Sequence, residues 1–189
     1  PSVLDGELLG RSSYEQFRLT GSTHFQIIEP SDEWDTISIN YTSGTTGSPK
    51  GVVYHNRGAY LNALGNAIEW DMNIHPIYLW TLPMFHCNGW CFPWTIAAKV
   101  GTNVCIRKVS AEAIFDALRR YGVTHLCGAP IVLSMMVNAT LAEKKFFDQS
   151  CKVMTAAAPP PAKVLQSMQE DGFEVTHVYG LTEVYGPCV

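Results

Sequence analysis

Residues 36–52 read TISINYTSGTTGSPKGV. The first six alternate in character, with Ile37, Ile39 and Tyr41 on one side and polar side chains on the other, which predicts a short β-strand. The strand leads directly into a loop made of Gly, Ser, Thr, Pro and Lys residues. We expect the rest of the chain to be organised around this strand and loop.

The loop has the composition of an anion-binding site. Gly44 and Gly47 allow main-chain N–H groups to approach a ligand closely, and Pro49 stiffens the approach to the lysine. The loop also contains four hydroxyl donors and one positive charge that could bind an anion. The hydroxyls belong to Ser43, Thr45, Thr46 and Ser48, and the charge to Lys50. The alternative is a flexible surface loop that happens to be rich in small polar residues. The concentration of these residues immediately after an apolar strand favours phosphate binding.

The loop is not a Walker A motif. That motif has four residues between its first Gly and a Gly-Lys pair, and Ser or Thr follows the lysine. Here Lys50 follows Pro49 and precedes Gly51. Kinase-type and GTPase-type interpretations are therefore disfavoured.

The composition is that of an ordinary globular protein. Of 189 residues, 47% are hydrophobic and 16% are charged, and the formal net charge is -4. The absence of a basic run argues against a nucleic-acid surface, and no apolar run approaches the roughly 20 residues that span a bilayer. We expect a protein inside the cell with reduced cysteines, since the six cysteines are scattered among apolar neighbours.

Strand and helix signals alternate along the chain. Strands are predicted at 77–82, 103–106, 123–126, 152–155 and 173–179. Helices are predicted near 12–17 and at 131–137, and two further helices are predicted to end near residues 98 and 172. Another helix is predicted to carry Tyr60, Leu61, Leu64 and Ile68 on one face. The clearest helix has Ser110 as N-cap, an apolar face of Ile114, Phe115, Leu118 and Tyr121, and Gly122 beyond its end.

This alternation predicts an α/β fold with a mainly parallel sheet flanked by helices. Ligands of such sheets bind beyond the carboxyl ends of the strands. Four segments follow strand candidates and are expected to face one crevice: the Gly-Thr loop, His86, residues 156–159 and residues 182–183.

Three motifs resemble those of the AMP-forming, adenylate-forming enzymes, and within them the acyl-CoA synthetases. They are YTSGTTGSPKGV at 41–52, PMFHCNGW at 83–90 and THVYGLTEVYGP at 176–187. The resemblance implies the large N-terminal domain of that family, with residues 1–34 as its N-terminal segment and 35–189 as its AMP-binding core. It also implies a fragment, because nothing matches the ribose-binding Asp or the C-terminal domain with its catalytic Lys.

The resemblance implies a carboxylate, ATP and coenzyme A as substrates, Mg²⁺ as cofactor, and no nucleic acid. Departing phosphates would be held by Ser43, Gly44, Thr45, Thr46, Gly47 and Lys50. Thr182 would contact the α-phosphate, and Glu183 would hold Mg²⁺. The adenine would lie between Tyr179, with Gly180 beside it, and a wall of Ala157, Ala158 and Pro159.

Each of these residues has a plainer interpretation. Taken alone, Glu183 would be a solvated carboxylate, but the preceding Tyr-Gly-Leu-Thr favours a role in the site. Tyr179 is also consistent with a core residue. His86 is as well explained by a satisfied polar residue as by a site-lining role between the acyl pocket and the thiol. Trp80, Trp90 and Trp94 are expected either to wall an acyl tunnel or to pack in the core.

Other chemistries are disfavoured. His86, Cys87 and Cys91 have no second ligand pair at zinc spacing, and no Gly-x-Ser-x-Gly elbow is present. One departure from the family is that Ala156 and Ala157 stand where a Gly usually precedes Ala-Pro, which is expected to alter the backbone approach to the nucleotide.

The most favoured function is a ligase for a short-chain or medium-chain fatty acid or an aromatic acid, in the cytoplasm or the peroxisome. An amino-acid adenylation module and a non-catalytic nucleotide-binding remnant remain alternatives.

Overall fold

The computed structural model describes residues 10–42, 47–144 and 150–188. The chain forms two compact units, Pro1–Ser31 and Asp32–Val189. No helix in the described ranges has both the length and the apolar character needed to cross a bilayer. All six cysteines are free thiols, as the sequence predicted.

Within residues 10–31, the described part of the first unit, the chain forms one short helix, α1 (Tyr14–Arg18). The Ser13 hydroxyl accepts a hydrogen bond from the Gln16 amide at 3.3 Å, and the Gln16 side chain accepts one from the Ser13 amide at 3.0 Å. This reciprocal capping box satisfies two amides that the helix itself cannot pair. The short helix predicted near 12–17 is confirmed.

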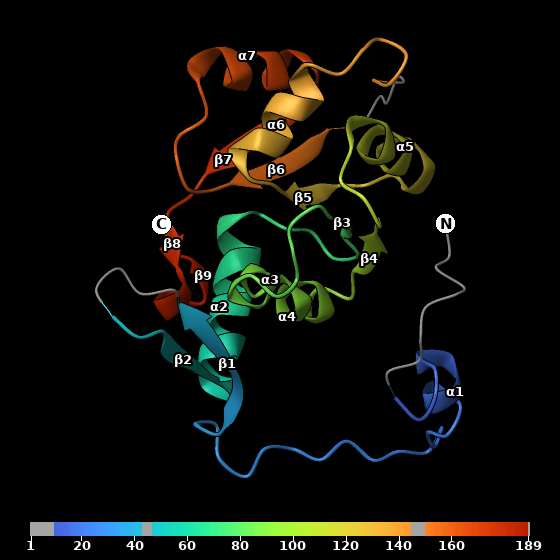
Figure 1. The fold of residues 1–189 in the computed structure, drawn as a ribbon, viewed down its shortest axis with the longest axis vertical. Helices are drawn as coiled ribbons and strands as arrows, with labels where there is room; N and C mark the ends of the chain where they lie inside the picture. Colours follow the sequence, from blue (N-terminus) through green and yellow to red (C-terminus); the bar gives the residue numbers. More distant parts are fainter. Residues whose placement is uncertain (1–9, 43–46, 145–149, 189) are drawn as a thin grey trace. The chain divides into compact units, whose positions relative to one another are not determined.

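The second unit is built on a five-stranded sheet in the order β4-β3-β5-β6-β7, and every neighbouring pair is parallel (Figure 1). Its strands are β3 (Ile77–Trp80), β4 (Thr102–Cys105), β5 (His125–Cys127), β6 (Cys151–Thr155) and β7 (Phe173–His177). The helices of this unit are α2 (Asn56–Glu69), α3 (Cys87–Trp90), α4 (Phe92–Ala98), α5 (Ala111–Tyr121), α6 (Pro130–Val137) and α7 (Ala162–Glu170). The predicted mainly parallel α/β fold is confirmed.

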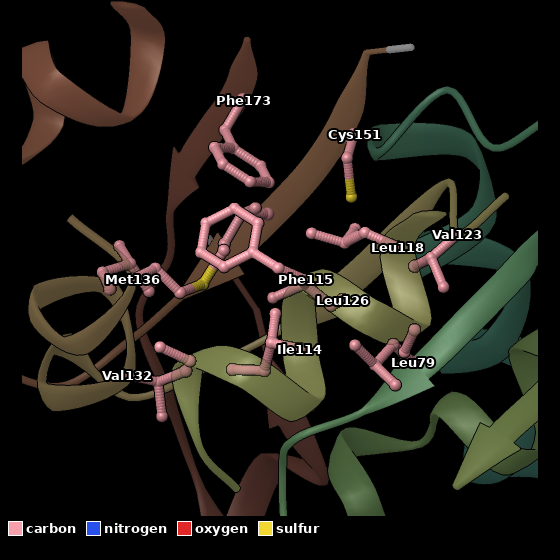
Figure 2. Packing of buried hydrophobic residues seen from close by; sticks show 14 of the residues in the cluster. Leu79, Ile114, Phe115, Leu118, Val123, Leu126, Val132, Met136, Cys151 and Phe173 are labelled. Atoms are coloured by element: carbon pink, nitrogen blue, oxygen red, sulfur yellow. The ribbon is translucent and has the colours of Figure 1, made fainter. Parts of the chain in front are cut away.

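Alternate residues of the strands enter two different cores. Leu79, Leu126 and Val153 pack with α5, α6 and α7 on one face of the sheet (Figure 2). Their neighbours Trp80 and Met154 pack on the other face with aromatic side chains from the α2 and α4 region. Both faces of the sheet are therefore covered, as expected of a parallel sheet.

Helix α5 forms as its sequence predicts. The Ala113 amide donates to the Ser110 hydroxyl at 3.3 Å, and Gly122 ends the helix in a left-handed conformation with φ 63°. Ile114 and Phe115 are fully or almost fully buried. Tyr121, predicted on the same face, is 46% exposed because the last turn extends past the core.

The predicted helix is present as α2, but the apolar residues that share one of its faces are not the residues that it buries. The structure buries Ala59, Ala63, Asn66 and Ala67 instead, while Tyr60, Leu61 and Ile68 are 65%, 51% and 73% exposed. The small residues allow α2 to approach α4 closely, and the Asn66 amide donates to the Trp90 carbonyl at 3.1 Å. The packing of α2 against α4 therefore determines which face of the helix is buried, and the pattern of large apolar residues does not.

The strand and loop at residues 36–52 belong to a hairpin and not to the parallel sheet. β1 (Thr36–Thr42) pairs antiparallel with β2 (Lys50–His55) in a separate two-stranded hairpin, and α2 begins only after β2. The alternation in β1 is present, but Ile39 and Tyr41 are exposed and the half-buried face is polar. The Gly-Thr loop thus connects the two hairpin strands and does not follow a strand of the parallel sheet.

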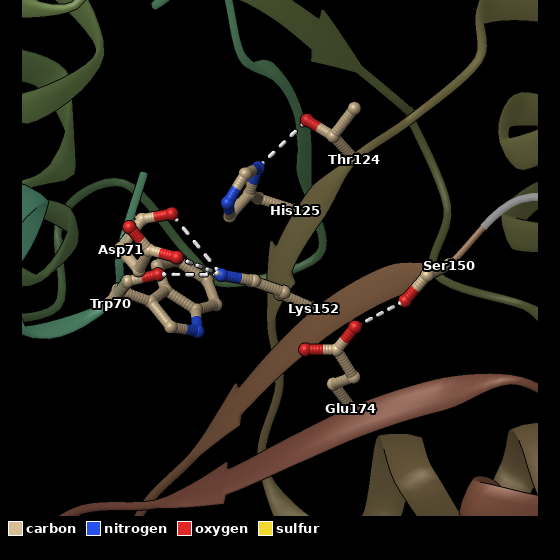
Figure 3. A network of polar contacts seen from close by, with 7 residues as sticks. All are labelled: Trp70, Asp71, Thr124, His125, Ser150, Lys152 and Glu174. Carbon is tan, nitrogen blue, oxygen red and sulfur yellow. Dashed lines mark hydrogen bonds and ion pairs between the residues drawn. The ribbon is translucent and has the colours of Figure 1, made fainter. Parts of the chain in front are cut away.

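A polar network occupies the amino end of the sheet (Figure 3). The Lys152 ammonium donates to the carbonyl oxygens of Trp70 and Asp71, each at 3.1 Å, and so binds the C-terminal end of α2. His125 lies beside them, with Nδ1 2.7 Å from the Thr124 hydroxyl. Burial, together with Lys152, lowers the pKa of His125 to about 4, so the folded protein holds it neutral.

Candidate active site

The turn η1 (Thr182–Val184) carries the predicted phosphate and metal ligands. It connects β8 (Gly180–Leu181) to β9 (Gly186–Pro187), which pair antiparallel. A Cβ atom at Gly180 would lie 1.9 Å from the carbonyl oxygen of Gly186, so this close pairing requires glycine. The glycines of the motif therefore have a structural purpose, which is to hold the turn.

Tyr54 of β2 connects the hairpin to this turn. Its hydroxyl donates to the Thr182 carbonyl oxygen at 2.6 Å, and its ring stacks on Tyr185 with centroids 3.9 Å apart. Burial, together with the nearby Cys87, Tyr185 and Glu183 groups, holds the pKa of Tyr54 far above its usual value. The hydroxyl therefore remains a hydrogen-bond donor to the turn at every physiological pH.

The segment after β3 folds as a left-handed turn. Five consecutive residues, from Cys87 to Cys91, have φ between 41° and 65°. Each left-handed residue costs roughly 1–2 kcal/mol unless it is glycine. A Cβ atom at Gly89 would lie 2.8 Å from the Trp80 ring, so this position has no room for a side chain. Strain of this kind persists where the surrounding structure maintains it, often at functional sites.

Contacts of the turn connect it to β1 and to η1. The Asn88 side-chain oxygen accepts hydrogen bonds from the Ser38 hydroxyl at 2.7 Å and from the Asn40 amide at 2.5 Å. Cys87 Sγ lies 3.5 Å from the Thr182 hydroxyl. Thr182 therefore lies against the turn that His86 precedes, and His86 itself is exposed.

The residues predicted for the adenine wall follow two paired strands. Thr155 of β6 pairs with His177 of β7, and the Val178 amide donates to the Thr155 carbonyl at 2.8 Å. The segments that follow these strands therefore start side by side. They contain the exposed residues predicted to contact the nucleotide base: Ala157, Ala158, Pro159 and Tyr179.

Ala157 has an unusual backbone conformation. Its φ is 75°, in the left-handed region that favours glycine, and its carbonyl oxygen lies 3.3 Å from His177 Nε2. Ala157 is the residue directly before Ala158-Pro159, where the resemblance implied a Gly. Ala157 therefore has a backbone conformation typical of glycine, and its Cβ atom makes this conformation sterically unfavourable.

The predicted phosphate loop is described only in part. Ser43, Gly44, Thr45 and Thr46 lie outside the described residues. Gly47 is exposed, and Lys50 is the exposed first residue of β2, paired with Thr42 of β1. The lysine side chain is therefore accessible to a ligand at the end of the hairpin.

Several residues of the site were not singled out from the sequence. Asn88 and Tyr185 lie inside quoted motifs, but their contacts with β1 and with Tyr54 depend on tertiary structure. The Trp94 indole donates to the Tyr185 hydroxyl at 2.7 Å, and burial raises the pKa of Tyr185 to about 12. Motif membership was the only sequence signal for Asn88 and Tyr185.

Glu183 is suited to a divalent cation that also binds phosphate. Its carboxylate is exposed, and none of the ion pairs among the described residues includes it. Mg²⁺ is commonly bound by one or two carboxylates together with substrate phosphates. The described ranges contain no cluster of three or more His, Cys, Asp or Glu residues that would hold a metal without a substrate. The residues present thus fit a metal ion delivered with a phosphorylated substrate.

The second unit has an open parallel sheet, and ligands of such sheets commonly bind beyond the carboxyl ends of the strands. The chain belongs to the AMP-binding enzyme family, whose model matches residues 3–189. This confirms the family that the motifs predicted.

Named relatives agree with this membership. The chain is 51% identical over 179 residues to the peroxisomal acetate/butyrate–CoA ligase AAE7 of Arabidopsis thaliana, covering 94% of this chain and 32% of that protein. It is 52% identical over 189 residues to the acetate–CoA ligase CCL3 of Humulus lupulus, covering 99% and 33%. The chain thus spans about a third of the length of the curated relatives it matches.

Solved structures show the same fold. The N-terminal domain of FACL13 from Mycobacterium tuberculosis aligns with a TM-score of 0.79 at 26% identity, covering 91% of this chain and 43% of that one. The o-succinylbenzoate coenzyme A synthetase MenE of Bacillus subtilis, in complex with ATP and magnesium ion, aligns with a TM-score of 0.73 at 26% identity, covering 86% and 34%.

Proposed function

We propose that this chain supplies the ATP-binding part of an AMP-forming carboxylate–CoA ligase. The observation that carries the proposal is the position of Thr182, whose carbonyl oxygen binds Tyr54 and whose hydroxyl faces Cys87. Three segments that are far apart in the sequence, each from one of the three family motifs or directly beside it, thus meet at one point. The naming of the relatives as CoA ligases supports the same activity.

The reaction would have two steps. A carboxylate oxygen attacks the α-phosphorus of ATP, and the bond from that phosphorus to the oxygen bridging the α- and β-phosphates breaks. Pyrophosphate leaves with the bridging oxygen, and an acyl-adenylate remains. The sulfur of coenzyme A then attacks the acyl carbon, AMP leaves with the electron pair of the broken bond, and the thiol proton passes to solvent or a base. Phosphoryl transfer of this kind depends on positioning and on charge stabilisation.

The chain's residues would divide these tasks. The loop residues Ser43, Thr45, Thr46 and Lys50 would bind the departing phosphates, with Gly44 and Gly47 allowing close approach. Thr182 would bind the α-phosphate. Tyr179 and the segment Ala157, Ala158 and Pro159 would enclose the adenine, and His86 would line the route between the acyl group and the thiol.

Glu183 would hold Mg²⁺. The ion, when bound, neutralises charge on the phosphate oxygens. The rigidity of η1 would keep the Glu183 carboxylate next to Thr182, because β8 and β9 fix both ends of the turn.

A small aliphatic carboxylate is the favoured substrate. The printed names of three relatives include acetate, butyrate and 2-methylpropanoate. We also propose that residues 1–34 and 35–189 belong to one domain, and that the protein acts in the cytoplasm or the peroxisome. The peroxisomal relative supports the second location.

Carboxylate-dependent exchange of labelled pyrophosphate into ATP tests the proposal in the full-length protein. We expect exchange with at least one member of a panel of aliphatic, aromatic and amino acids, and CoA thioester formation on addition of coenzyme A. Exchange with amino acids alone would favour an amino-acid adenylation module. Exchange with no carboxylate would overturn the ligase assignment and leave a nucleotide-binding remnant.

A further inference from the structure

Strand β2 carries two side chains that bear on different parts of the candidate site. Lys50, its first residue, is predicted to bind the departing phosphates, and Tyr54 follows four residues later. Because alternate residues of a strand share a face, Lys50, Val52 and Tyr54 lie on the same side of β2. Each residue of β2 has a partner in β1. Lys50 and Tyr54 are therefore held along one paired strand.

The Thr182 carbonyl oxygen accepts hydrogen bonds from two sides. The Tyr54 hydroxyl donates to it at 2.6 Å, and the Tyr185 amide donates to it at 3.1 Å. The bond from the Tyr185 amide closes η1, so Glu183 lies within the closed turn. The Tyr54 hydroxyl therefore binds the oxygen atom that closes the turn, and connects the turn to β2.

The Thr182 side chain has a weaker contact. Its hydroxyl lies 3.5 Å from Cys87 Sγ, and a thiol is a weak hydrogen-bond donor and acceptor. The hydroxyl can therefore rotate toward a phosphate oxygen, while its place in the site is set by the Thr182 backbone. The hydrogen bond from Tyr54 to that backbone helps to fix the distance between Thr182 and the hairpin.

Tyr54 is itself held rigidly. Its side chain is buried, and its ring stacks on Tyr185 with centroids 3.9 Å apart and planes 15° apart. It packs with Ala59, Ala63 and Cys91 in a small apolar cluster. A buried and stacked ring has little freedom left to lose, so its hydroxyl is already oriented toward the turn.

We propose that Tyr54 is a positioning residue for the adenylation step, which keeps Thr182 and Glu183 at a fixed distance from Lys50. This proposal rests on the proposed function. Lys50 would bind the departing phosphates, while Thr182 and Glu183 would act on the α-phosphate and its metal ion. A rigid connection between the two sets would align the α-phosphorus with the attacking carboxylate, and alignment of this kind contributes strongly to rate. Tyr54 would act through Thr182 and not by touching the substrate.

The first test is Tyr54→Phe in the full-length protein, assayed by carboxylate-dependent pyrophosphate exchange. This variant keeps the ring and its stack but removes the hydroxyl. We expect kcat to fall by about tenfold and the KM for ATP to change little, because the connection aligns the transition state and adds no contact to bound ATP.

The two diastereomers of ATP that carry sulfur on the α-phosphate report the alignment directly. A site that holds the α-phosphate in one orientation uses one diastereomer faster than the other. We expect Tyr54→Phe to reduce this ratio of rates by about fivefold, since the turn is no longer held at one distance from the hairpin. A smaller folded fraction would lower both rates equally and leave the ratio unchanged. The ratio therefore separates positioning from stability.

Matched variants complete the test. Tyr121→Phe makes the same chemical change at a half-exposed tyrosine of α5, and Ile114→Val loosens the core around that helix. Both should keep the wild-type kcat and ratio, although Ile114→Val should lower the urea midpoint. Tyr185→Leu removes the ring that supports Tyr54 but keeps the Tyr54 hydroxyl, and should lower the ratio part of the way. It also serves as the second variant if Tyr54→Phe does not fold.

The outcomes are distinguishable. No exchange by the wild-type protein with any carboxylate would overturn the proposed function. An active wild-type protein with unchanged kcat and ratio in Tyr54→Phe would overturn the positioning role alone. A loss of rate with an unchanged ratio would assign Tyr54 to stability, and equal use of both diastereomers by the wild type would show that the α-phosphate has no fixed orientation. Either result would also overturn the positioning role.

Discussion

The two ends of the parallel sheet are built in different ways. At the amino end, Lys152 binds the two carbonyls at the end of α2, while the buried Nε2 of His125 and Nε1 of Trp70 have no hydrogen-bond partner among the described residues. Beyond the carboxyl end, Glu183 is exposed, as is Lys50 at the end of the β1–β2 hairpin. Left-handed non-glycine residues occur at both ends, with Asn88 and Ala157 after strands and Asp71 and His75 before β3. The two ends therefore differ in what their charged groups contact: Lys152 is held by backbone carbonyls, whereas Glu183 forms none of the ion pairs among the described residues and is accessible to a ligand.

The largest expected effect is on ligand binding at the carboxyl end. Lys50→Ala and Glu183→Gln should each weaken binding of Mg-ATP by about 10-fold to 100-fold, because a charge-assisted contact is worth roughly 1.5–3 kcal/mol. Calorimetric titration of the full-length protein measures the affinity. Lys163→Ala and Glu112→Gln, at exposed positions on α7 and α5, are the controls. Unchanged affinity in both site variants would contradict the assignment of this end as the binding end.

The matched effect at the amino end is on stability. Lys152→Ala should lower the free energy of unfolding by about 2 kcal/mol, since two carbonyls lose a charged donor. Urea denaturation measures the change, and Lys152→Met separates loss of the ammonium from loss of packing. Lys50→Ala, a change of the same residue type, should alter stability by no more than about 0.5 kcal/mol. Equal destabilisation by both lysine variants would abolish the contrast between the two ends.

The pH dependence of stability should also originate at the amino end. His125 is neutral when folded, with its pKa lowered to about 4 by burial and by Lys152, while Glu174 acts in the opposite direction. The unfolded chain binds the proton near pH 6.5, so stability is full above that pH and is lost as the pH falls towards 4. The expected loss between pH 7.5 and 5 is about 2 kcal/mol. Urea denaturation across this range should give a flatter profile for His125→Gln than for the wild type.

The smallest expected effect concerns strain at the carboxyl end. Ala157→Gly should stabilise the protein by about 0.5–1 kcal/mol, because relief of the left-handed alanine exceeds the added freedom of the unfolded chain. Ala158→Gly, next in the chain and without a positive φ, should destabilise it by a similar amount. The thermal midpoints of the two variants should move in opposite directions. Movement in the same direction would show that strain at Ala157 has no energetic consequence.

Local sequence patterns were sufficient for most of the fold. The cap at Ser110, the apolar face of α5 and Gly122 beyond it are contained within one short stretch, and all three are observed. The face of α2 was not predictable in the same way. Tyr60, Leu61 and Ile68 remain largely exposed, because α2 packs inward through Ala59, Ala63, Asn66 and Ala67. Its partner α4 buries Phe92, Thr95 and Ile96. Such a choice depends on the partner surface and not on periodicity.

For the site, the motifs identified which segments matter, because the glycines and hydroxyls suited to phosphate occur at fixed spacing within short stretches. How those segments are joined was decided only by tertiary structure. The partner of β1 is β2 and not the parallel sheet, and Tyr54, Asn88 and Trp94 acquire their contacts from segments up to 128 residues away. Hydrogen bonds and ring contacts over such separations leave no local pattern, because they depend on where the folded sheet brings distant turns together.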